Sequence, residues 1–381
     1  MESSYIYGFI LSLVVALIAT PLVKKLAIAV GAVDKPNHRK VHQRLMPRLG
    51  GLAIYLGFLA AYLLVFPPFL EKIGPFLEQM GISSEAMVET YSRATLGIFI
   101  GGTIIVLVGA LDDRFELSPK LKLLGQIVAA AVVVYYGLRI EFVNLPFQGM
   151  LSFEWDWIAI GITIFWIVGI TNAVNLIDGL DGLAAGVSGI ATAAMMIMAV
   201  FVMPNPVVAL YCAILLGGIL GFLRYNFHPA KIFMGDTGAL FLGFNLATLS
   251  IMGFKNTTLF AFIIPILILG VPLSDTIFAM VRRFLNKQPI SVADKEHLHH
   301  CLLAMGLSHR GAVLAIYGIS FVFATAAIVF SQSTLWGALI IVCALLFILQ
   351  LVAELIGWVG QKKKPLLETA RRIKQMTTGK Q

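Results

Sequence analysis

Six aspartates stand at the ends of strongly apolar segments of this chain: Asp112, Asp113, Asp178, Asp181, Asp236 and Asp275. Carboxylates at the border of a membrane are costly, and they are usually paired, bound to a metal or functional. The surrounding sequence is mostly apolar, since its mean hydropathy is +0.90 and only 13% of its residues are charged. Carboxylates gathered on one side of a membrane indicate a divalent cation and an anionic substrate at that side.

The adjacent pair Asp112 and Asp113 ends one of these apolar segments. The dipole at a helix C-terminus is already negative, so two acids placed there need a partner. A solvated loop would carry them harmlessly, but the apolar flanks 107–111 and 121–124 hold them at the membrane surface. We therefore expect either a bound metal or one carboxyl whose raised pKa suits a general base.

Polar side chains recur at every third position of a second motif: Asn172, Asn175, Asp178 and Asp181. Neighbours three apart share a helix face, but four in a row drift around it. Gly179 and Gly182 predict that the helix opens here into a turn with exposed backbone. Amide and carboxylate oxygens suit a hard cation such as Mg²⁺. The alternative is a capping motif between helices, and for Asn172 that alternative is equally good.

A third motif places Asp236 between Gly235 and Gly238, five residues after Lys231. Asp is a good N-cap, and capping alone would explain the carboxylate. Capping would not explain the flanking glycines, which allow a phosphate or a metal to approach the backbone. Phe233 could stack on a base, although a Phe in the core or against lipid is commoner.

Two further segments are rich in cationic or imidazole side chains. Arg48 precedes a Gly50-Gly51 pair at the expected start of a helix, and a cation beside free backbone N–H groups binds anions. An ordinary basic loop is the alternative there. The HLHH segment (residues 297–300) has three histidines in four residues but no Cys or upstream His to complete a zinc site. Beside arginines, such histidines serve as donors to a pyrophosphate.

The elements that position these motifs are long apolar helices. Eleven segments of about 17–25 residues can each span a bilayer. Their expected bounds are 5–27, 49–68, 94–111, 119–137, 156–173, 183–203, 206–223, 236–253, 259–283, 311–330 and 335–357. Of the 28 Lys and Arg residues, 24 fall on the face that carries the motifs. The positive-inside rule then places the N-terminus outside and the C-terminus in the cytosol.

The expected fold is therefore all-α: a polytopic integral membrane protein with one transmembrane domain (1–357) and a basic cytosolic tail (358–381). The net charge of +8 follows from this topology and from a tail near anionic lipid, so it is not a nucleic-acid signal. The three cysteines have no metal spacing and predict no disulfide. An ion-coupled transporter is the rival class, but it would place its acids near the midplane and often shows repeats, which this sequence does not.

Four ordered motifs together resemble the polyprenyl-phosphate N-acetylhexosamine-1-phosphate transferase family: LDDRFELS at 111–118, NAVNLIDGLDGLAAG at 172–186, FHPAKIFMGDTGALFLG at 227–243 and HLHH at 297–300. The resemblance implies Mg²⁺-dependent transfer of a sugar 1-phosphate from a UDP-sugar to undecaprenyl phosphate, with release of UMP. Mn²⁺ is a possible substitute for Mg²⁺. The partners implied are thus a UDP-sugar, undecaprenyl phosphate and membrane lipid, and a homodimer is left open.

The resemblance also implies roles for particular residues. Asn175 and Asp236 resemble the metal ligands, and the acid pair resembles the residues that activate the lipid phosphate or support the metal. The predicted catalytic residues are Asp112, Asp113, Asp178, Asp181, His297, His299 and His300. The predicted substrate-binding residues are Arg48, Asn172, Lys231, Phe233, Arg282 and Arg283. Asp275, about two helical turns before the two arginines, is interpreted as their structural partner.

The form of the histidine motif indicates the donor. HLHH resembles the branch that uses UDP-N-acetylglucosamine, as in teichoic acid synthesis. The phospho-N-acetylmuramoyl-pentapeptide branch has three consecutive histidines, and Leu298 breaks that run here. The pentapeptide donor is kept as the alternative.

Overall fold

The computed structural model describes residues 2–34, 45–79, 84–140, 142–145, 149–152, 155–254, 259–285, 287, 297–356 and 358. The segment between 34 and 45, the one between 287 and 297 and the tail from 359 lie outside the described residues. The expectations for the first basic loop and for the cytosolic tail therefore stay predictions. Trp358 is buried, so the packed part of the chain extends past the expected boundary at 357.

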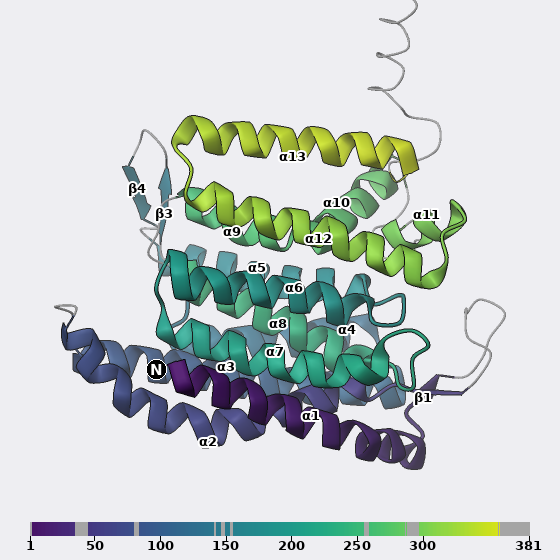
Figure 1. Cartoon of the computed structure of the whole chain (residues 1–381), viewed down its shortest axis with the longest axis horizontal. Helices are drawn as coiled ribbons and strands as arrows, with labels where there is room; N and C mark the ends of the chain where they lie inside the picture. The colour runs from purple at the N-terminus through teal and green to yellow at the C-terminus, as the bar shows by residue number, and fades with distance from the viewer. Residues whose placement is uncertain are drawn as a thin grey trace, which may run out of the picture.

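The described chain is built of helices, most of which run side by side along the long direction of the molecule (Figure 1). The helices are α1 (Glu2–Val30), α2 (Gly50–Gln79), α3 (Ser84–Phe115), α4 (Pro119–Tyr135), α5 (Asp156–Leu176), α6 (Leu183–Ile197), the π-helical turn η1 (Met198–Val202), α7 (Pro206–Asn226), α8 (Gly235–Phe254), α9 (Leu259–Ile268), α10 (Gly270–Leu285), α11 (Leu298–Ala304), α12 (His309–Ser331) and α13 (Leu335–Ile356).

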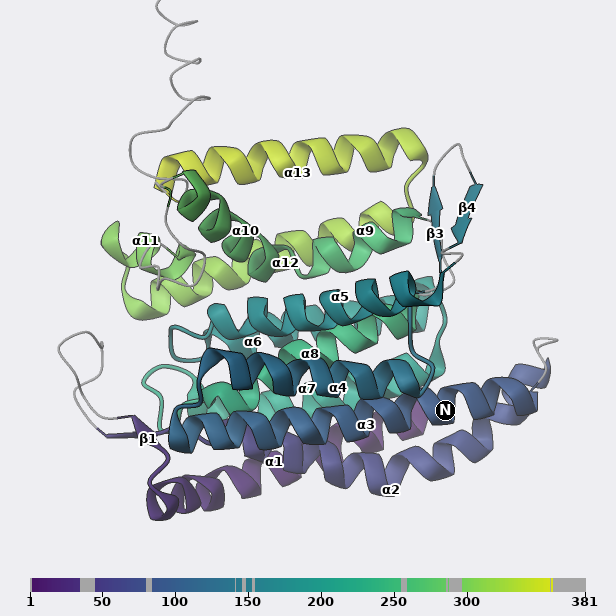
Figure 2. The ribbon, with the colours of Figure 1, turned by 180° about the vertical axis from the view of Figure 1, so that it is seen from behind.

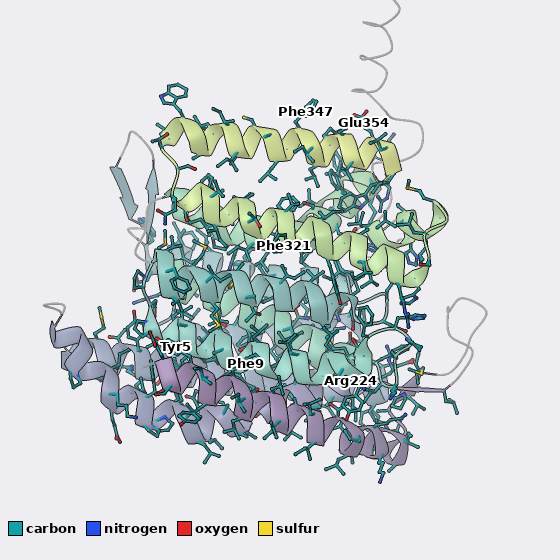
Figure 3. All side chains as sticks on the ribbon, in the orientation of Figure 1. Tyr5, Phe9, Arg224, Phe321, Phe347 and Glu354 are labelled. Atoms are coloured by element: carbon teal, nitrogen blue, oxygen red, sulfur yellow. The ribbon has the colours of Figure 1, made fainter. Side chains whose placement is uncertain are left out.

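Eight of the described helices are long and apolar enough to cross a bilayer: α1, α2, α3, α5, α6 extended by η1, α7, α12 and α13. The three other expected spans coincide with α4, with α8 and with the pair α9–α10. Large apolar side chains face outward from the bundle, among them Phe321 of α12 and Phe347 of α13 (Figure 3). Helices satisfy their own backbone polar groups, so such a surface suits lipid. The chain is a helical, multi-pass membrane protein.

Local sequence explains where several helices begin. Ser118 accepts a hydrogen bond from Leu121 N at 3.5 Å, and Pro119 takes the first position of α4. Asn205 accepts from Val208 N at 3.2 Å at the start of α7. Side-chain caps satisfy N–H groups that have no partner within the helix.

Two short antiparallel hairpins depart from the all-α expectation. β1 (Val33–Asp34) pairs with β2 (Met46–Pro47), and β3 (Phe142–Leu145) pairs with β4 (Gly149–Ser152). Strands of two to four residues carry too little periodicity to be read from sequence. The hairpins lie at opposite ends of the bundle, β1 at the end that carries α11 (Figures 1 and 2).

The expected span 259–283 is broken into two helices. α9 and α10 are separated at Leu269, and α10 then runs obliquely from α9 and α12 toward the end of α13 (Figure 2). Pro272 lies in the first turn of α10, where a proline is tolerated but the preceding residues are restricted. Asp275 in the second turn of α10 contacts His297 and Leu298 at the start of α11, and Arg282 in its last turn contacts Trp358.

Candidate active site

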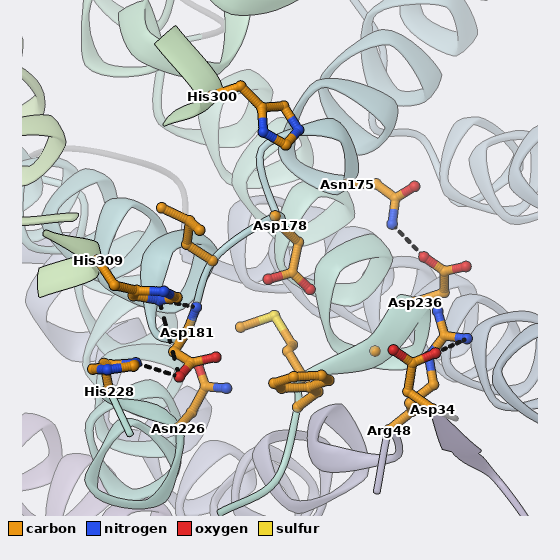
Figure 4. Close-up of a pocket in the computed structure, with 15 residues that line it drawn as sticks. Asp34, Arg48, Asn175, Asp178, Asp181, Asn226, His228, Asp236, His300 and His309 are labelled. Atoms are coloured by element: carbon orange, nitrogen blue, oxygen red, sulfur yellow. Dashed lines mark hydrogen bonds and ion pairs between the residues drawn. The ribbon is translucent and has the colours of Figure 1, made fainter. Parts of the chain in front are cut away.

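A cavity of about 430 Å³ opens at the end of the bundle that carries β1 and α11 (Figure 4). Its lining includes four aspartates, an arginine and three histidines. The lining residues are Asp34, Arg48, Asn175, Asp178, Gly179, Leu180, Asp181, Asn226, His228, Phe233, Met234, Gly235, Asp236, His300 and His309. Three of the four sequence motifs, and Arg48, thus contribute side chains to one hollow.

Glycines bring the first turn of α8 into close contact with its neighbours. A Cβ on Gly51 of α2 would overlap the backbone of Gly238, and a Cβ on Gly109 of α3 would overlap Thr237. Gly235 has a φ of +69°, and a Cβ there would overlap the Arg48 carbonyl oxygen and the Asp113 carboxylate. These glycines therefore pack helices together around the start of α8.

Asp113 caps this same turn from another helix. Its Oδ1 accepts from Asp236 N at 2.9 Å, and its Oδ2 accepts from Thr237 N at 3.0 Å and from Thr237 Oγ1 at 2.6 Å. The side chain is fully buried, and Arg48 Nε lies 3.9 Å from Oδ1. Three donors satisfy the carboxylate as an N-cap would. Asp113 therefore fixes the position of Asp236.

The Lys122 ammonium group lies among three oxygen-bearing side chains. We call the four residues the lysine cluster: Lys122, Asp112, Asn175 and Asp236. Lys122 Nζ lies 2.7 Å from Asp236 Oδ2, 3.1 Å from Asp112 Oδ2 and 3.2 Å from Asn175 Oδ1. Asn175 Nδ2 also donates to Asp236 Oδ1 at 2.5 Å. The oxygens of Asn175 and Asp236 thus converge on one cationic group. Hard oxygen ligands of this kind fit Mg²⁺.

Asp112 is held more loosely than its neighbour Asp113. Its Oδ1 accepts from Leu117 N at 2.7 Å, just beyond the end of α3, and its Oδ2 pairs with Lys122. The side chain keeps 9% of its surface exposed, whereas that of Asp113 has none. The adjacent acids therefore differ in their contacts. Asp113 accepts hydrogen bonds from the first turn of α8, and Asp112 belongs to the lysine cluster.

Asp178 carries the most perturbed carboxyl of the cavity outside the membrane-spanning helices. Although part of its surface faces the cavity, desolvation and then the charges of Asp236 and Asp113 together raise its pKa to about 8. Arg48 acts in the opposite direction. A carboxyl in this position holds a proton near neutral pH unless a cation binds beside it.

Asp181 meets two histidines on the other side of the cavity (Figure 4). Its Oδ2 lies 2.7 Å from His228 Nδ1 and accepts from Ala230 N at 3.0 Å. His309 Nε2 accepts from Asp181 N at 3.0 Å, and its ring stacks on that of His228 with centroids 4.1 Å apart. The backbone N–H assigns the proton of a neutral His309 to Nδ1. Asp181 therefore orients an imidazole pair at the cavity wall.

The HLHH segment divides its histidines between support and cavity. His297 Nδ1 lies 2.8 Å from Asp275 Oδ2 and is buried. His299 is also buried, and its imidazole packs so closely on Gly179 that a Cβ there would overlap the ring. Burial is the main cause that lowers the pKa of His299 to about 3, and the charge of His300 is the next. The His299 ring is therefore neutral. Only His300 of the three lines the cavity.

The prediction that the backbone N–H groups after Arg48 are free to bind an anion is wrong. Gly50 N donates to the Phe233 carbonyl at 3.0 Å, and Gly51 N donates to that of Met234 at 2.8 Å. The two segments pair because both are extended where α2 and α8 begin. Arg48 itself lines the cavity, 3.6 Å from Asp34, and Phe233 lines it too.

Four predicted substrate-binding residues lie outside the cavity lining. Asn172 Nδ2 donates to Gln126 Oε1 at 2.5 Å and to the Val168 carbonyl at 2.8 Å, so it links α5 to α4 and caps neither helix. Lys231 is exposed, with its Nζ 6.0 Å from the Tyr225 ring. Arg282 is buried and donates to the Trp358 carbonyl, and Arg283 follows it in the last turn of α10.

Sequence reasoning missed five residues that line the cavity or join its charges: Asp34, Lys122, Asn226, His228 and His309. Asn226 Oδ1 accepts from Gly182 N at 3.0 Å, which ties the second motif to the third. Lys122 had a signal, because a lysine within the apolar run Leu121–Leu124 is costly without an acidic partner. In the sequence, Lys122 counts only toward the 24 basic residues of one face.

The sequence profile of glycosyl transferase family 4 matches residues 95–254. A probable undecaprenyl-phosphate N-acetylglucosaminyl 1-phosphate transferase of Bacillus subtilis (strain 168) is 47% identical over 97% of this chain and 96% of its own length. A decaprenyl-phosphate N-acetylglucosaminephosphotransferase of Mycolicibacterium smegmatis is 34% identical over 80% of this chain and 76% of its own.

A more distant relative represents the other branch. A phospho-N-acetylmuramoyl-pentapeptide-transferase of Listeria monocytogenes is 31% identical over 67% of this chain and 76% of its own length. The relatives are bacterial transferases that act at the membrane, and the apolar helices make this chain a multi-pass protein of the cytoplasmic membrane. The resemblance seen in the four motifs is confirmed, and the chain belongs to glycosyl transferase family 4.

Proposed function

We propose that this protein transfers N-acetylglucosamine 1-phosphate from UDP-N-acetylglucosamine to undecaprenyl phosphate, releases UMP and so initiates a cell-envelope glycopolymer such as teichoic acid. The observation that carries the proposal is the lysine cluster at one wall of a cavity that His300 also lines. The 47% identity to a probable undecaprenyl-phosphate N-acetylglucosaminyl 1-phosphate transferase supports the donor and the acceptor.

The reaction joins two anions, so the site must neutralise charge. An oxygen of the lipid phosphate bonds to the sugar-bearing phosphorus of the donor, and the bond to the bridging oxygen breaks as UMP leaves. Mg²⁺ held by Asn175 and Asp236 would supply positive charge to the pyrophosphate when bound. Lys122 and Arg48 would offset further charge, and His300 would donate hydrogen bonds from the cavity wall.

Asp112 is the carboxyl proposed to orient or deprotonate the lipid phosphate. Asp113 has both oxygens engaged by α8, whereas Asp112 contacts Lys122, Leu117 N and the Asp236 carboxyl. A group that accepts a proton must be free to approach the substrate. Asp178 and Asp181 are proposed to act on the uridine side, where both line the cavity with Phe233.

A single assay tests the donor and the metal. UMP release is measured from UDP-N-acetylglucosamine and from UDP-N-acetylmuramoyl-pentapeptide, with and without undecaprenyl phosphate, in Mg²⁺, Mn²⁺ or EDTA. We expect release only from the first donor, only with lipid phosphate, and only with a divalent cation. Preference for the pentapeptide donor would assign the chain to the other branch, and full activity in EDTA would remove the metal from the mechanism.

We also propose eleven spans, with the N-terminus outside and the C-terminus in the cytosol. The support is the sequence distribution of Lys and Arg, because 24 of the 28 fall in the loops that the eleven-span model places on one face. A reporter fused after Gln381 is expected to be cytosolic, and one inserted near Glu78 is expected to be external. A reversed result at either point would require a different number of spans.

A further inference from the structure

Trp358 follows the last membrane helix and is bound by α10 through both its backbone and its ring. Its side chain is 1% exposed, and its ring meets that of Phe278 at 4.7 Å with an angle of 64°. The indole N–H donates to Asp275 Oδ1 at 3.0 Å, and Arg282 Nη1 donates to the Trp358 carbonyl at 2.6 Å. Asp275, Phe278 and Arg282 of α10 are three and four positions apart, so they share one helix face.

Asp275 joins this tryptophan to the HLHH segment. Its Oδ1 also accepts from Leu298 N at 2.8 Å, and its Oδ2 lies 2.8 Å from His297 Nδ1. The residue is only 1% exposed. A buried carboxylate is tolerated when several donors satisfy it, and the loss of one donor weakens the hold on the others. One carboxylate thus ties the chain after α13 to the start of α11.

The HLHH segment connects the start of α11, which Asp275 holds in position, to the cavity. Leu298 begins α11, His299 packs against Gly179, and His300 lines the cavity. The direction of these two imidazoles follows from where α11 begins. The position of Leu298 N, and hence of α11, is fixed by the carboxylate that also accepts from Trp358.

We infer that Trp358 is a positioning residue for the donor site: through Asp275 it holds the HLHH segment in the orientation that places His300 on the cavity wall. The inference rests on the proposed function, in which this segment meets the donor. A tryptophan that only filled space would need only apolar neighbours. Here the indole N–H meets a buried carboxylate, and such polar contacts fix orientation as well as burial.

Trp358→Phe keeps a ring on Phe278 and removes only the N–H. We expect the KM for the UDP-sugar to rise about tenfold, because a hydrogen bond to a charged group is lost, while the KM for undecaprenyl phosphate stays unchanged. Trp336→Phe is the matched control, since Trp336 lies in α13, the helix that precedes Trp358, and is 75% exposed. An unchanged donor KM, or an equal rise in both KM values with a lower melting temperature, would overturn the inference.

A double-mutant cycle tests the route through Asp275. Trp358→Phe and Asp275→Asn act on the same hydrogen bond, so the double variant should have a donor KM no higher than that of the worse single variant. Effects that multiply would show that Trp358 acts independently of Asp275, which would overturn the route.

Truncation separates Trp358 from the basic tail. A chain that stops after Gly360 is expected to keep the donor KM, and one that stops after Ile356 is expected to raise it about tenfold or more. Equal KM values for the two truncations would overturn the inference. If the wild type consumes a different UDP-sugar, the proposed donor fails, and the same KM ratios measured on that sugar still decide the role of Trp358.

Discussion

The lysine cluster and the HLHH segment belong to the same site but are held in different ways. The lysine cluster stands on the ends of α3, α4, α5 and α8, which pack on one another in the centre of the bundle. The HLHH segment stands on α11, a helix of seven residues held by Asp275. The first is fixed by long helices of the core, and the second is fixed by hydrogen bonds to Asp275 and by packing of Leu298 and Leu302.

Charge separates the two regions as well. The lysine cluster holds two carboxylates and one ammonium group, with Asp113 and Asp178 close enough to interact electrostatically. In the HLHH segment, burial keeps His299 neutral. The difference teaches that one region gathers carboxylates around a single ammonium group, whereas the other places the neutral imidazole of His299 beside His300 at the cavity.

Asp236→Asn is the substitution with the largest expected effect. It removes a negative oxygen from the lysine cluster and from the proposed metal site, so turnover should fall to background while the protein remains folded and inserted. UMP release and calorimetric binding of Mg²⁺ with the donor measure the two losses. Asp156→Asn is the control, because Asp156 is exposed and lies outside the cavity. Substantial turnover by Asp236→Asn in excess chelator would contradict the comparison.

The adjacent acids should separate into a chemical and a structural role. Asp112→Asn should lower the rate about 10²–10⁴-fold, as loss of a general base does, with donor binding and melting temperature close to those of the wild type. Asp113→Asn should lower both rate and melting temperature, because it places an amide N–H against the donors of Asp236 and Thr237.

Thr237→Val tests more narrowly how Asp113 caps the start of α8. It removes only the hydroxyl donor to Asp113 and should cost about 1 kcal/mol of stability. Equal melting temperatures for both Asn variants would mean that the acids are interchangeable, contrary to their different hydrogen bonds.

The sequence predicted the chemistry of the lysine cluster better than its supports. The family resemblance paired Asn175 with Asp236, and both side chains line the cavity. No local pattern shows which of two adjacent acids turns inward, and Asp113 caps a helix that begins more than 120 residues later along the chain. Lys122 was missed because a lysine near a helix start is also what the positive-inside rule produces.

Fold prediction succeeded and failed for related reasons. Hydropathy locates long apolar helices, because each must be apolar over the thickness of a bilayer. It cannot detect that a continuous apolar run such as 259–283 bends, because α9 and α10 are both apolar and the break depends on packing against α12. The contact between Trp358 and Asp275 joins residues 83 positions apart and has no local signature.

Gly179→Ala should have a smaller effect than the acid substitutions. A Cβ at this position overlaps the His299 imidazole, so the HLHH segment has to shift while the lysine cluster stays in place. Misplacement of about 1 Å can cost up to about 100-fold in rate, and we expect the loss to appear mainly in the donor KM. Gly169→Ala is the control, because its Cβ would meet no atom within 4 Å. A wild-type donor KM would show that His299 can move without consequence.

Asp178→Asn should weaken donor binding on the uridine side, and its effect on stability, the smallest expected here, should depend on pH. The folded protein binds the Asp178 proton more tightly than the unfolded chain does, because the pKa is raised from 3.8 to about 8. Stability therefore falls as pH rises through that window, and it is lowest where the carboxyl is ionised. Asn resembles the protonated acid and removes this dependence.

In chelator, the Asp178→Asn variant should melt a few degrees higher than the wild type at pH 8–9 and close to it at the acid end. With Mg²⁺ present the difference should shrink, because a nearby cation stabilises the ionised carboxylate. Melting curves from pH 5 to 9 in detergent measure both effects, and a difference that is constant with pH would show that Asp178 is not a strained acid of the cation-binding region.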